Sequence, residues 1–113
     1  MFDSVKKYVG GLLNPVYEYQ ISIGLNDKDE HKQLISEDLA RAFIGSKFAE
    51  GCTIYRANGF YCGESEKSLI VFVYAAKSEK DKILQAAEDI RYIMNQKQVI
   101  VNVSKAKNTF WIG

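Results

Sequence analysis

One apolar run constrains the fold of this chain more than any other feature of its sequence. Residues 69–76 read Leu-Ile-Val-Phe-Val-Tyr-Ala-Ala, without a charged side chain. Such a run, rich in β-branched and aromatic residues, is typical of a strand that other elements cover on both sides. Because side chains alternate along a strand, one of two sets of residues must face away from the protein's core. The two sets are Leu69, Val71 and Val73, and Ile70, Phe72 and Tyr74.

Further strands are predicted on both sides of this run. Residues 16–25 alternate apolar and polar side chains, which is typical of a half-buried strand. Residues 52–61 and 98–104 show strand patterns as well, and the run itself extends the third strand to 68–76. The polar segment 62–67 links the second strand to the third.

Two helices are predicted between these strands. The first begins at Asp27, which forms an approximate capping box with Glu30, and it ends near Ile44. The second begins at Ser78 and buries an apolar stripe at helical spacing. The stripe consists of Ile83, Ala87, Ile90 and Met94.

The resulting order of elements is β-α-β-β-α-β. With right-handed crossovers, its two βαβ units interleave into a four-stranded antiparallel sheet with both helices on one face. We therefore predict an α+β, ferredoxin-like fold for residues 16–113, preceded by an N-terminal arm over residues 1–15. We expect the apolar tail 109–112 to add a short fifth strand or to dock on the sheet.

The dipeptide Asn58-Gly59 leaves the path of the second strand open. It is a strong hairpin signal, but a bulge or kink would give the flanking strands matched lengths, and we expect the bulge. Neither geometry brings Cys52 close enough to Cys62 for a disulfide. We expect both to be buried free thiols, as a reducing compartment allows.

Composition and charge exclude several classes of protein. The chain has 113 residues, 47% of them hydrophobic, and a formal charge of +1. Intrinsic disorder is therefore not expected, nor is a general attraction to nucleic acid or anionic lipid. No segment approaches the roughly 18 apolar residues of a membrane helix. We expect a cytoplasmic protein without a membrane partner.

Motifs for catalysis or metal binding are sparse. His31 is the only histidine, and at helical spacing only Asp27 could join it as a metal ligand. The segment 24–27 lacks the glycines and the lysine of a phosphate-binding loop. We therefore expect no metal, no cofactor and no catalytic residue of a known motif.

RNA binding is an alternative, because RNA-recognition domains share this strand order. Those domains stack bases on aromatic side chains of the exposed sheet face. Here Ser22, Leu69 and Val71 occupy the corresponding positions. Nucleic acid is therefore not the partner that we expect.

A polar cluster along the second strand and the following loop is the candidate ligand site. Directed donors and acceptors beside an aromatic wall are what a small-molecule site requires. The alternative interpretation is an ordinary kinked strand and a solvated loop. The candidate ligand-binding residues are Arg56, Asn58, Tyr61, Glu64 and Lys67.

The apolar strand also predicts an interface. An exposed apolar patch is usually covered, here by the chain's own ends, by a second copy or by another protein. We expect a second copy, in a dimer or trimer that pairs sheet against sheet. The candidate interface residues are Ile70, Phe72, Tyr74 and Trp111.

Several segments carry a resemblance to known proteins over residues 17–112. They are Ile23-Gly24-Leu25, Gly51-Cys52-Thr53-Ile54, Gly59-Phe60-Tyr61 and Ser68-Leu69-Ile70-Val71. Through these segments the chain resembles a family of uncharacterised small bacterial domains. More broadly, its arrangement of elements resembles that of small ferredoxin-like proteins that assemble through their sheets, including PII-type signalling trimers and dimeric α/β-barrel monooxygenases. The PII-type resemblance implies binding of a nucleotide or small metabolite between subunits, near the loop that joins the second and third strands.

Two functional hypotheses follow from these observations. The first is a non-enzymatic binding module, an oligomer that captures a small ligand or a protein partner through residues 56–67. A phage or mobile-element inhibitor that acts by sequestration is one version of it. The second is a cofactor-independent enzyme resembling the α/β-barrel monooxygenases, with Tyr17, Tyr19 or His31 in a cleft between sheet and helices.

Overall fold

A computed structural model describes residues 16–107 and Thr109. The order of elements is β-α-β-β-α-β, as predicted. The N-terminal arm, Trp111 and, apart from Thr109, the tail expected to form a fifth strand lie outside the described residues. The elements are β1 (Val16–Gly24), α2 (Glu37–Lys47), β2 (Thr53–Tyr61), β3 (Glu64–Ala76), the 3₁₀ turn η1 (Lys77–Glu79), α3 (Lys80–Ile93) and β4 (Ile100–Lys105).

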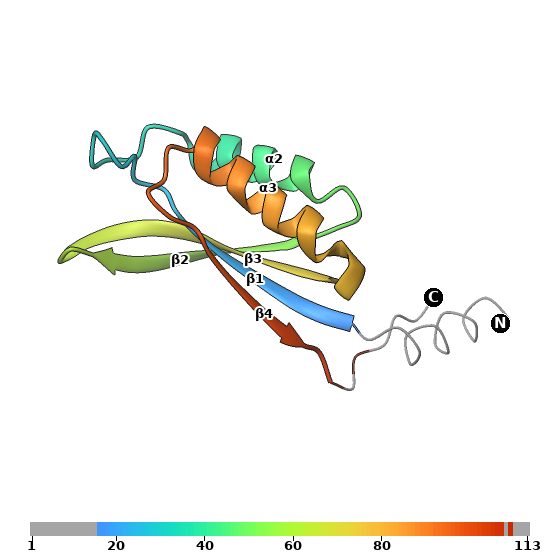
Figure 1. Cartoon of the computed structure of the whole chain (residues 1–113). Helices are drawn as coiled ribbons and strands as arrows, with labels where there is room; N and C mark the ends of the chain where they lie inside the picture. Colours follow the sequence, from blue (N-terminus) through green and yellow to red (C-terminus); the bar gives the residue numbers. More distant parts are fainter. Residues whose placement is uncertain (1–15, 108, 110–113) are drawn as a thin grey trace, which may run out of the picture.

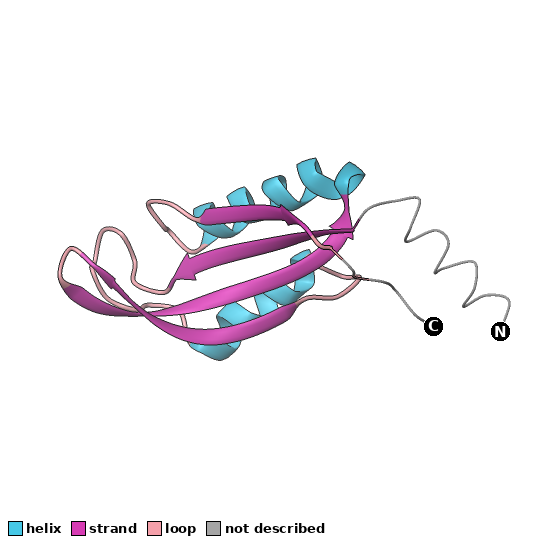
Figure 2. Cartoon of the chain, turned by 90° about the horizontal axis from the view of Figure 1, so that it is seen from below, coloured by secondary structure: helices cyan, strands magenta, loops and turns pink. Residues whose placement is uncertain are grey.

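The strands form one four-stranded sheet in the order β2-β3-β1-β4. Each neighbouring pair is antiparallel. Both helices lie on the same face of this sheet (Figure 1), and Figure 2 shows the face that they leave uncovered. The prediction of an α+β domain with an antiparallel sheet and two helices is confirmed. None of the helices within residues 16–107 is long and apolar enough to cross a membrane.

The core lies between the sheet and the two helices. Ile21 and Ile23 of β1 are fully buried, and Ala40 and Ile44 of α2 pack into the same cluster. The predicted stripe of α3 is confirmed, because all of its members are buried. These members are Ile83, Ala87, Ile90 and Met94.

The start of the first helix differs from the prediction. α2 begins after Ser36, whose Oγ accepts a hydrogen bond from the Leu39 N–H at 3.1 Å. Asp27 instead stabilises an isolated turn, because its carboxylate accepts hydrogen bonds from the N–H groups of Asp29 and Glu30. The prediction that the first helix begins at Asp27 is therefore wrong, because a side chain that can cap a helix can also stabilise an isolated turn.

The hairpin turn also lies elsewhere than the sequence signal suggested. β2 and β3 pair without interruption from Thr53 opposite Phe72 to Tyr61 opposite Glu64, so neither a bulge nor a turn occurs at Asn58-Gly59. The chain turns at Cys62 and Gly63, with φ values of 52° and 80°. Positive φ at both central residues is what a type I′ hairpin turn requires.

Both cysteines are free thiols, as expected, but their burial differs from the prediction. Cys52 is half-buried, and burial raises the pKa of its thiol. Cys62 is exposed, because it occupies the tip of the hairpin rather than the interior of a strand.

The structure decides which side of β3 faces outward. Leu69 and Val71 are fully buried beneath the helices, which turns Ile70, Phe72 and Tyr74 to the uncovered face. Ile70 and Phe72 are half-buried there, and Tyr74 is 48% exposed. The uncovered face of the sheet is therefore apolar along β3.

Candidate functional site

The β2–β3 hairpin projects past one end of the sheet. Residues 68–76 of β3 pair with β1, but residues 64–67 continue beyond the end of β1 and pair with β2 alone. The projection is visible in Figure 1 at the end of the sheet where β1 leads into the loop before α2. This hairpin can therefore form one wall of a site whose floor is the face of the sheet.

A cleft with a volume of about 520 Å³ lies against this hairpin. The volume is within the range of about 300–1,000 Å³ that is usual for small-molecule sites. Its floor is the uncovered face of the sheet, at four residues that carry a small side chain or none. The floor residues are Ser22, Gly24, Gly59 and Ser68. The surrounding wall residues include Asn26, Asp27, His31, Tyr61, Glu64, Glu66 and Gln96.

The carboxylate of Glu66 is fixed at the edge of this floor. Its Oε2 accepts a hydrogen bond from the Asn26 N–H at 3.0 Å. It also lies directly over Gly24, where a Cβ atom would come within 2.7 Å of Glu66 Oε1. The hairpin therefore delivers a charged group to the end of β1.

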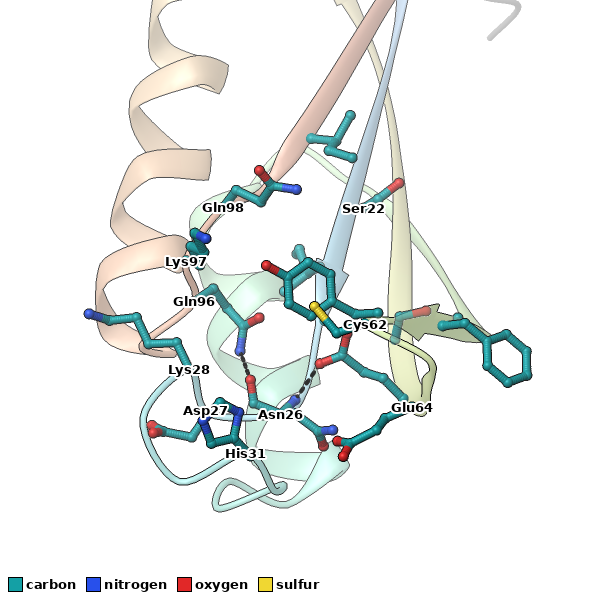
Figure 3. A pocket seen from close by; sticks show the side chains of 18 residues that line it. Ser22, Asn26, Asp27, Lys28, His31, Cys62, Glu64, Gln96, Lys97 and Gln98 are labelled. Atoms are coloured by element: carbon teal, nitrogen blue, oxygen red, sulfur yellow. Dashed lines mark hydrogen bonds between the residues drawn. The ribbon is translucent and has the colours of Figure 1, made fainter.

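Asn26 is held from its other side by Gln96. The Gln96 side chain is 6% exposed, and its Nε2 donates hydrogen bonds to the carbonyl groups of Asn26, at 2.8 Å, and Met94, at 3.2 Å. Figure 3 draws the bond to Asn26 beside the bond from Asn26 to the carboxylate. The peptide groups flanking Asn26 thus connect the end of α3 to the hairpin.

A second set of contacts fixes Asp27 at the rim of the cleft. Asn95 Nδ2 donates hydrogen bonds to Asp27 Oδ1 at 2.9 Å and to Asp29 Oδ2 at 2.8 Å. The bond from Asn95, followed by that from the Glu30 N–H, holds the pKa of Asp27 below its usual range. Asp27 therefore carries a negative charge at neutral pH.

Charged side chains of both signs surround the cleft, with three carboxylates and two amines. Carboxylates of Asp27, Glu64 and Glu66 line the cleft together with the amines of Lys28 and Lys97. In Figure 3 the Lys28 side chain extends away from the side chain of Glu64. A cation in the cleft would meet fixed carboxylates, and an aromatic side chain, Tyr61, is available beside them.

The sheet divides the candidate ligand residues into two groups. Tyr61 and Glu64 line the cleft. Asn58 and Lys67 pair with each other in the ladder and alternate with cleft residues, so their side chains lie on the opposite face of the sheet.

Arg56 belongs to that opposite face and has a structural partner there. Its Nε donates to Glu37 Oε1 at 2.7 Å, and its Nη2 donates to Glu37 Oε2 at 2.7 Å. This bidentate pair joins β2 to α2, and the Arg56 guanidinium lowers the pKa of Glu37 to about 2. The contact explains the arginine without a ligand.

The sequence did not single out Gly24, Asn26 or Gln96, and Glu66 was included only within the candidate segment 56–67. Each is unremarkable locally, and they meet only because β3 runs past β1 and the end of α3 returns to the same place. The one available signal was Gly24, a glycine inside an otherwise regular strand pattern.

The residues considered for an enzyme lie in three different surroundings. Tyr19 is fully buried, its hydroxyl donates to the Ala76 carbonyl at 3.4 Å, and burial raises its pKa. Tyr17 packs against the core. His31 lines the cleft, so it alone of the three borders the candidate site.

Comparison with known proteins identifies structural neighbours only. No family model matches the sequence, and no curated protein matches it. The fold is similar to a phage SAM lyase in its apo state, with 21% identity, a TM-score of 0.63 and coverage of 79% of each chain.

Two further structures share the fold. One is a phage SAM lyase in complex with S-methyl-5′-thioadenosine, with 19% identity and a TM-score of 0.57, covering 81% of this chain and 82% of that one. The other is the de novo designed protein Foldit4, with 9% identity and a TM-score of 0.50, covering 81% of this chain and 99% of that one. At these identities the similarity shows a shared α+β fold, and function must be argued from the cleft.

Proposed function

We propose that this chain is a binding module for a cationic adenosyl compound of the S-adenosylmethionine (SAM) class, held in the cleft beside Glu66. The observation that carries the proposal is the Glu66 carboxylate, which is hydrogen-bonded at 3.0 Å to the Asn26 N–H at the edge of a cleft of about 520 Å³. A fixed carboxylate in a partly enclosed site attracts a sulfonium group more strongly than one in open water does.

The shape of the cleft supports the same class of ligand. The Glu66 carboxylate covers Gly24, but at residues 22, 59 and 68 the floor carries no side chain larger than that of serine, which leaves room for a planar base on the sheet. The structural neighbours add support, because one of them is a phage SAM lyase bound to S-methyl-5′-thioadenosine. That compound shares the adenosyl group and lacks the sulfonium charge.

We further infer a ferredoxin-like arrangement and a sheet-mediated oligomer for this module. The order β2-β3-β1-β4 is what two interleaved βαβ units produce. Tyr55 packs edge-on against Phe72, with ring centroids 5.5 Å apart, and extends the apolar face that Ile70 and Tyr74 form. A second copy in a dimer or trimer would remove this face from water.

Cleavage of the bound compound is the second candidate function. It is favoured by the fold shared with phage SAM lyases and by carboxylates and an imidazole at the cleft, from Asp27, Glu66 and His31. Carboxylates and imidazoles are among the side chains that serve as general bases. A phage role that removes SAM by sequestration or by cleavage would use the same cleft.

Isothermal titration calorimetry with SAM and with S-adenosylhomocysteine, which lacks the sulfonium charge, tests the proposal. We expect SAM to bind more tightly, and Glu66→Gln to remove about tenfold of that preference, or about 1.4 kcal/mol. Glu50→Gln, at an exposed residue outside the cleft, is the matched control. Failure of both compounds to bind contradicts the proposal.

Chromatography of the same mixtures distinguishes binding from cleavage. A pure binding module returns SAM unchanged after prolonged incubation. Release of S-methyl-5′-thioadenosine by the wild-type chain, and not by Glu66→Gln, favours the second candidate.

A further inference from the structure

Gly24 is a glycine that its own backbone does not require. It ends β1 in regular pairing opposite Ser68. Its φ is not positive, in contrast to those of Gly51 and Gly63 among the described glycines. Glycine inside a strand is unfavourable, because it has no side chain to pack and loses more conformational freedom on folding. Another feature of the structure must therefore explain it.

The space that a side chain would take at Gly24 is occupied by Glu66. A Cβ atom at residue 24 would lie 2.7 Å from Glu66 Oε1 and 2.8 Å from both Glu66 Cδ and Oε2. All three carboxylate atoms thus lie against the bare backbone of β1. A real Cβ atom does not approach other atoms so closely, so the carboxylate would have to move.

In the described part of the chain, hydrogen bonding at Glu66 fixes one carboxylate oxygen and leaves the other without a hydrogen bond. Oε2 accepts from the Asn26 N–H at 3.0 Å, and the Asn26 carbonyl accepts from the buried Gln96 amide at 2.8 Å. Among the described residues, no hydrogen bond is formed to Glu66 Oε1. The carboxylate is therefore held in place with one oxygen still available at the cleft.

From these contacts we propose that Gly24 is a positioning residue, whose missing side chain seats the Glu66 carboxylate where it meets the positive charge of the ligand. The functional part of this inference rests on the proposed function. Gly24 itself contributes no group to the ligand. It acts through Glu66 and thereby sets the preference for a charged over an uncharged adenosyl compound.

Gly24→Ala tests the proposal without breaking the fold. The clashing atoms belong to the free end of a flexible side chain, so the carboxylate moves and the strand stays. We expect the affinity for SAM to fall about tenfold, and the affinity for S-methyl-5′-thioadenosine to change less than twofold. Gly45→Ala, in α2 with open space around the new Cβ, is the control and leaves both affinities unchanged.

A double-mutant cycle separates positioning from a merely structural effect. In a Glu66→Ala background there is no carboxylate to displace, so Gly24→Ala should then have no further effect on SAM affinity. An equal loss in both backgrounds, or no loss in either, overturns the proposal.

A measurement on the ligand-free protein keeps this inference separate from the proposed function. The Asn26 amide proton resonance should move in Glu66→Ala, because that N–H donates to the carboxylate. We expect Gly24→Ala to move it as well, and by more than Gly24→Ala does in a Glu66→Ala background. If the wild-type chain binds no adenosyl compound, the proposed function fails. If Gly24→Ala moves the Asn26 resonance equally with and without the Glu66 carboxylate, Gly24 does not seat Glu66.

Discussion

A substitution at Gly59 should affect the stability of the fold and the binding of a ligand in opposite directions. It lies inside β2 opposite Glu66, its φ is not positive, and a Cβ atom there would meet no atom within 4 Å. Neither backbone nor packing requires glycine at this position. The cleft does, because Gly59 forms part of its floor.

The expected effect of Gly59→Val on stability follows from strand energetics. Glycine in a strand costs roughly 0.5–1 kcal/mol relative to alanine, and valine is among the residues that favour strands. At about 4–8 °C per kcal/mol for a domain of this size, the melting temperature should rise by about 2–8 °C. The expected effect on binding has the opposite sign, because the isopropyl group occupies the floor. We expect SAM affinity to fall at least about tenfold.

Scanning calorimetry and titration calorimetry on one preparation check both signs together. Gly45→Ala is the control, since removing a helical glycine stabilises by about 1 kcal/mol and should leave binding unchanged. A Gly59→Val chain that melts lower than wild type contradicts the stability argument. One that binds SAM as wild type does shows that the floor of the cleft is not where the ligand lies.

Three other features give separate predictions. The pKa of Glu37 falls from 4.5 to about 2 through its pairing with Arg56, so this stabilisation is complete above about pH 4.5 and is lost as the pH falls toward 2. In Glu37→Gln, the melting temperature should no longer show the fall between pH 4.5 and 2 that this ion pair causes. An unchanged plot of melting temperature against pH contradicts the attribution of that fall to Glu37. Ser36→Ala removes the cap of α2 and should cost about 1 kcal/mol, measured by urea unfolding; no loss would place the start of α2 elsewhere. Phe72→Asp should reduce the mass measured by light scattering to that of a monomer, because the sheet contact would bury an unpaired carboxylate. Leu39→Asp, at a residue of α2 that is 61% exposed, should leave the mass unchanged. A wild-type chain that is already monomeric contradicts the sheet-mediated oligomer.

The fold was predictable where local pattern and tertiary packing agree. The stripe of α3 is buried as expected, since the helical periodicity specifies which face the helix buries. Of the run 69–76, only Leu69, Val71 and Val73 are buried. Only tertiary packing chooses between the two faces of a doubly apolar strand. The structure turns Leu69 and Val71 inward because their alternation matches that of Ile21 and Ile23 on β1.

The predictions failed where two local signals competed. A turn at Asn58-Gly59 would place Cys52 opposite Ser65 and leave the apolar run without β2 beside it. The observed register instead places Ile54 opposite Val71. The free energy gained by burying these side chains outweighs the cost of a positive φ at Cys62. No feature of the sequence predicted that conformation.

The candidate site was half predictable for a related reason. Tyr61 and Glu64 were identified because they border a polar loop next to an aromatic strand. Glu66, Asn26 and Gln96 come together through long-range contacts, with the Asn26–Glu66 and Asn26–Gln96 hydrogen bonds joining residues 40 and 70 positions apart. Such distances are fixed by strand register, which composition and spacing do not reveal.

Mapping of amide chemical shifts during a titration with SAM tests the binding site most directly. We expect the largest changes to cluster on the cleft floor and its edge, at Gly24, Asn26, Gly59, Glu66 and Ser68. Changes confined to the outer surface of the helices, around Leu39 and Tyr92, or no saturable change at all, would contradict the placement of the ligand in this cleft.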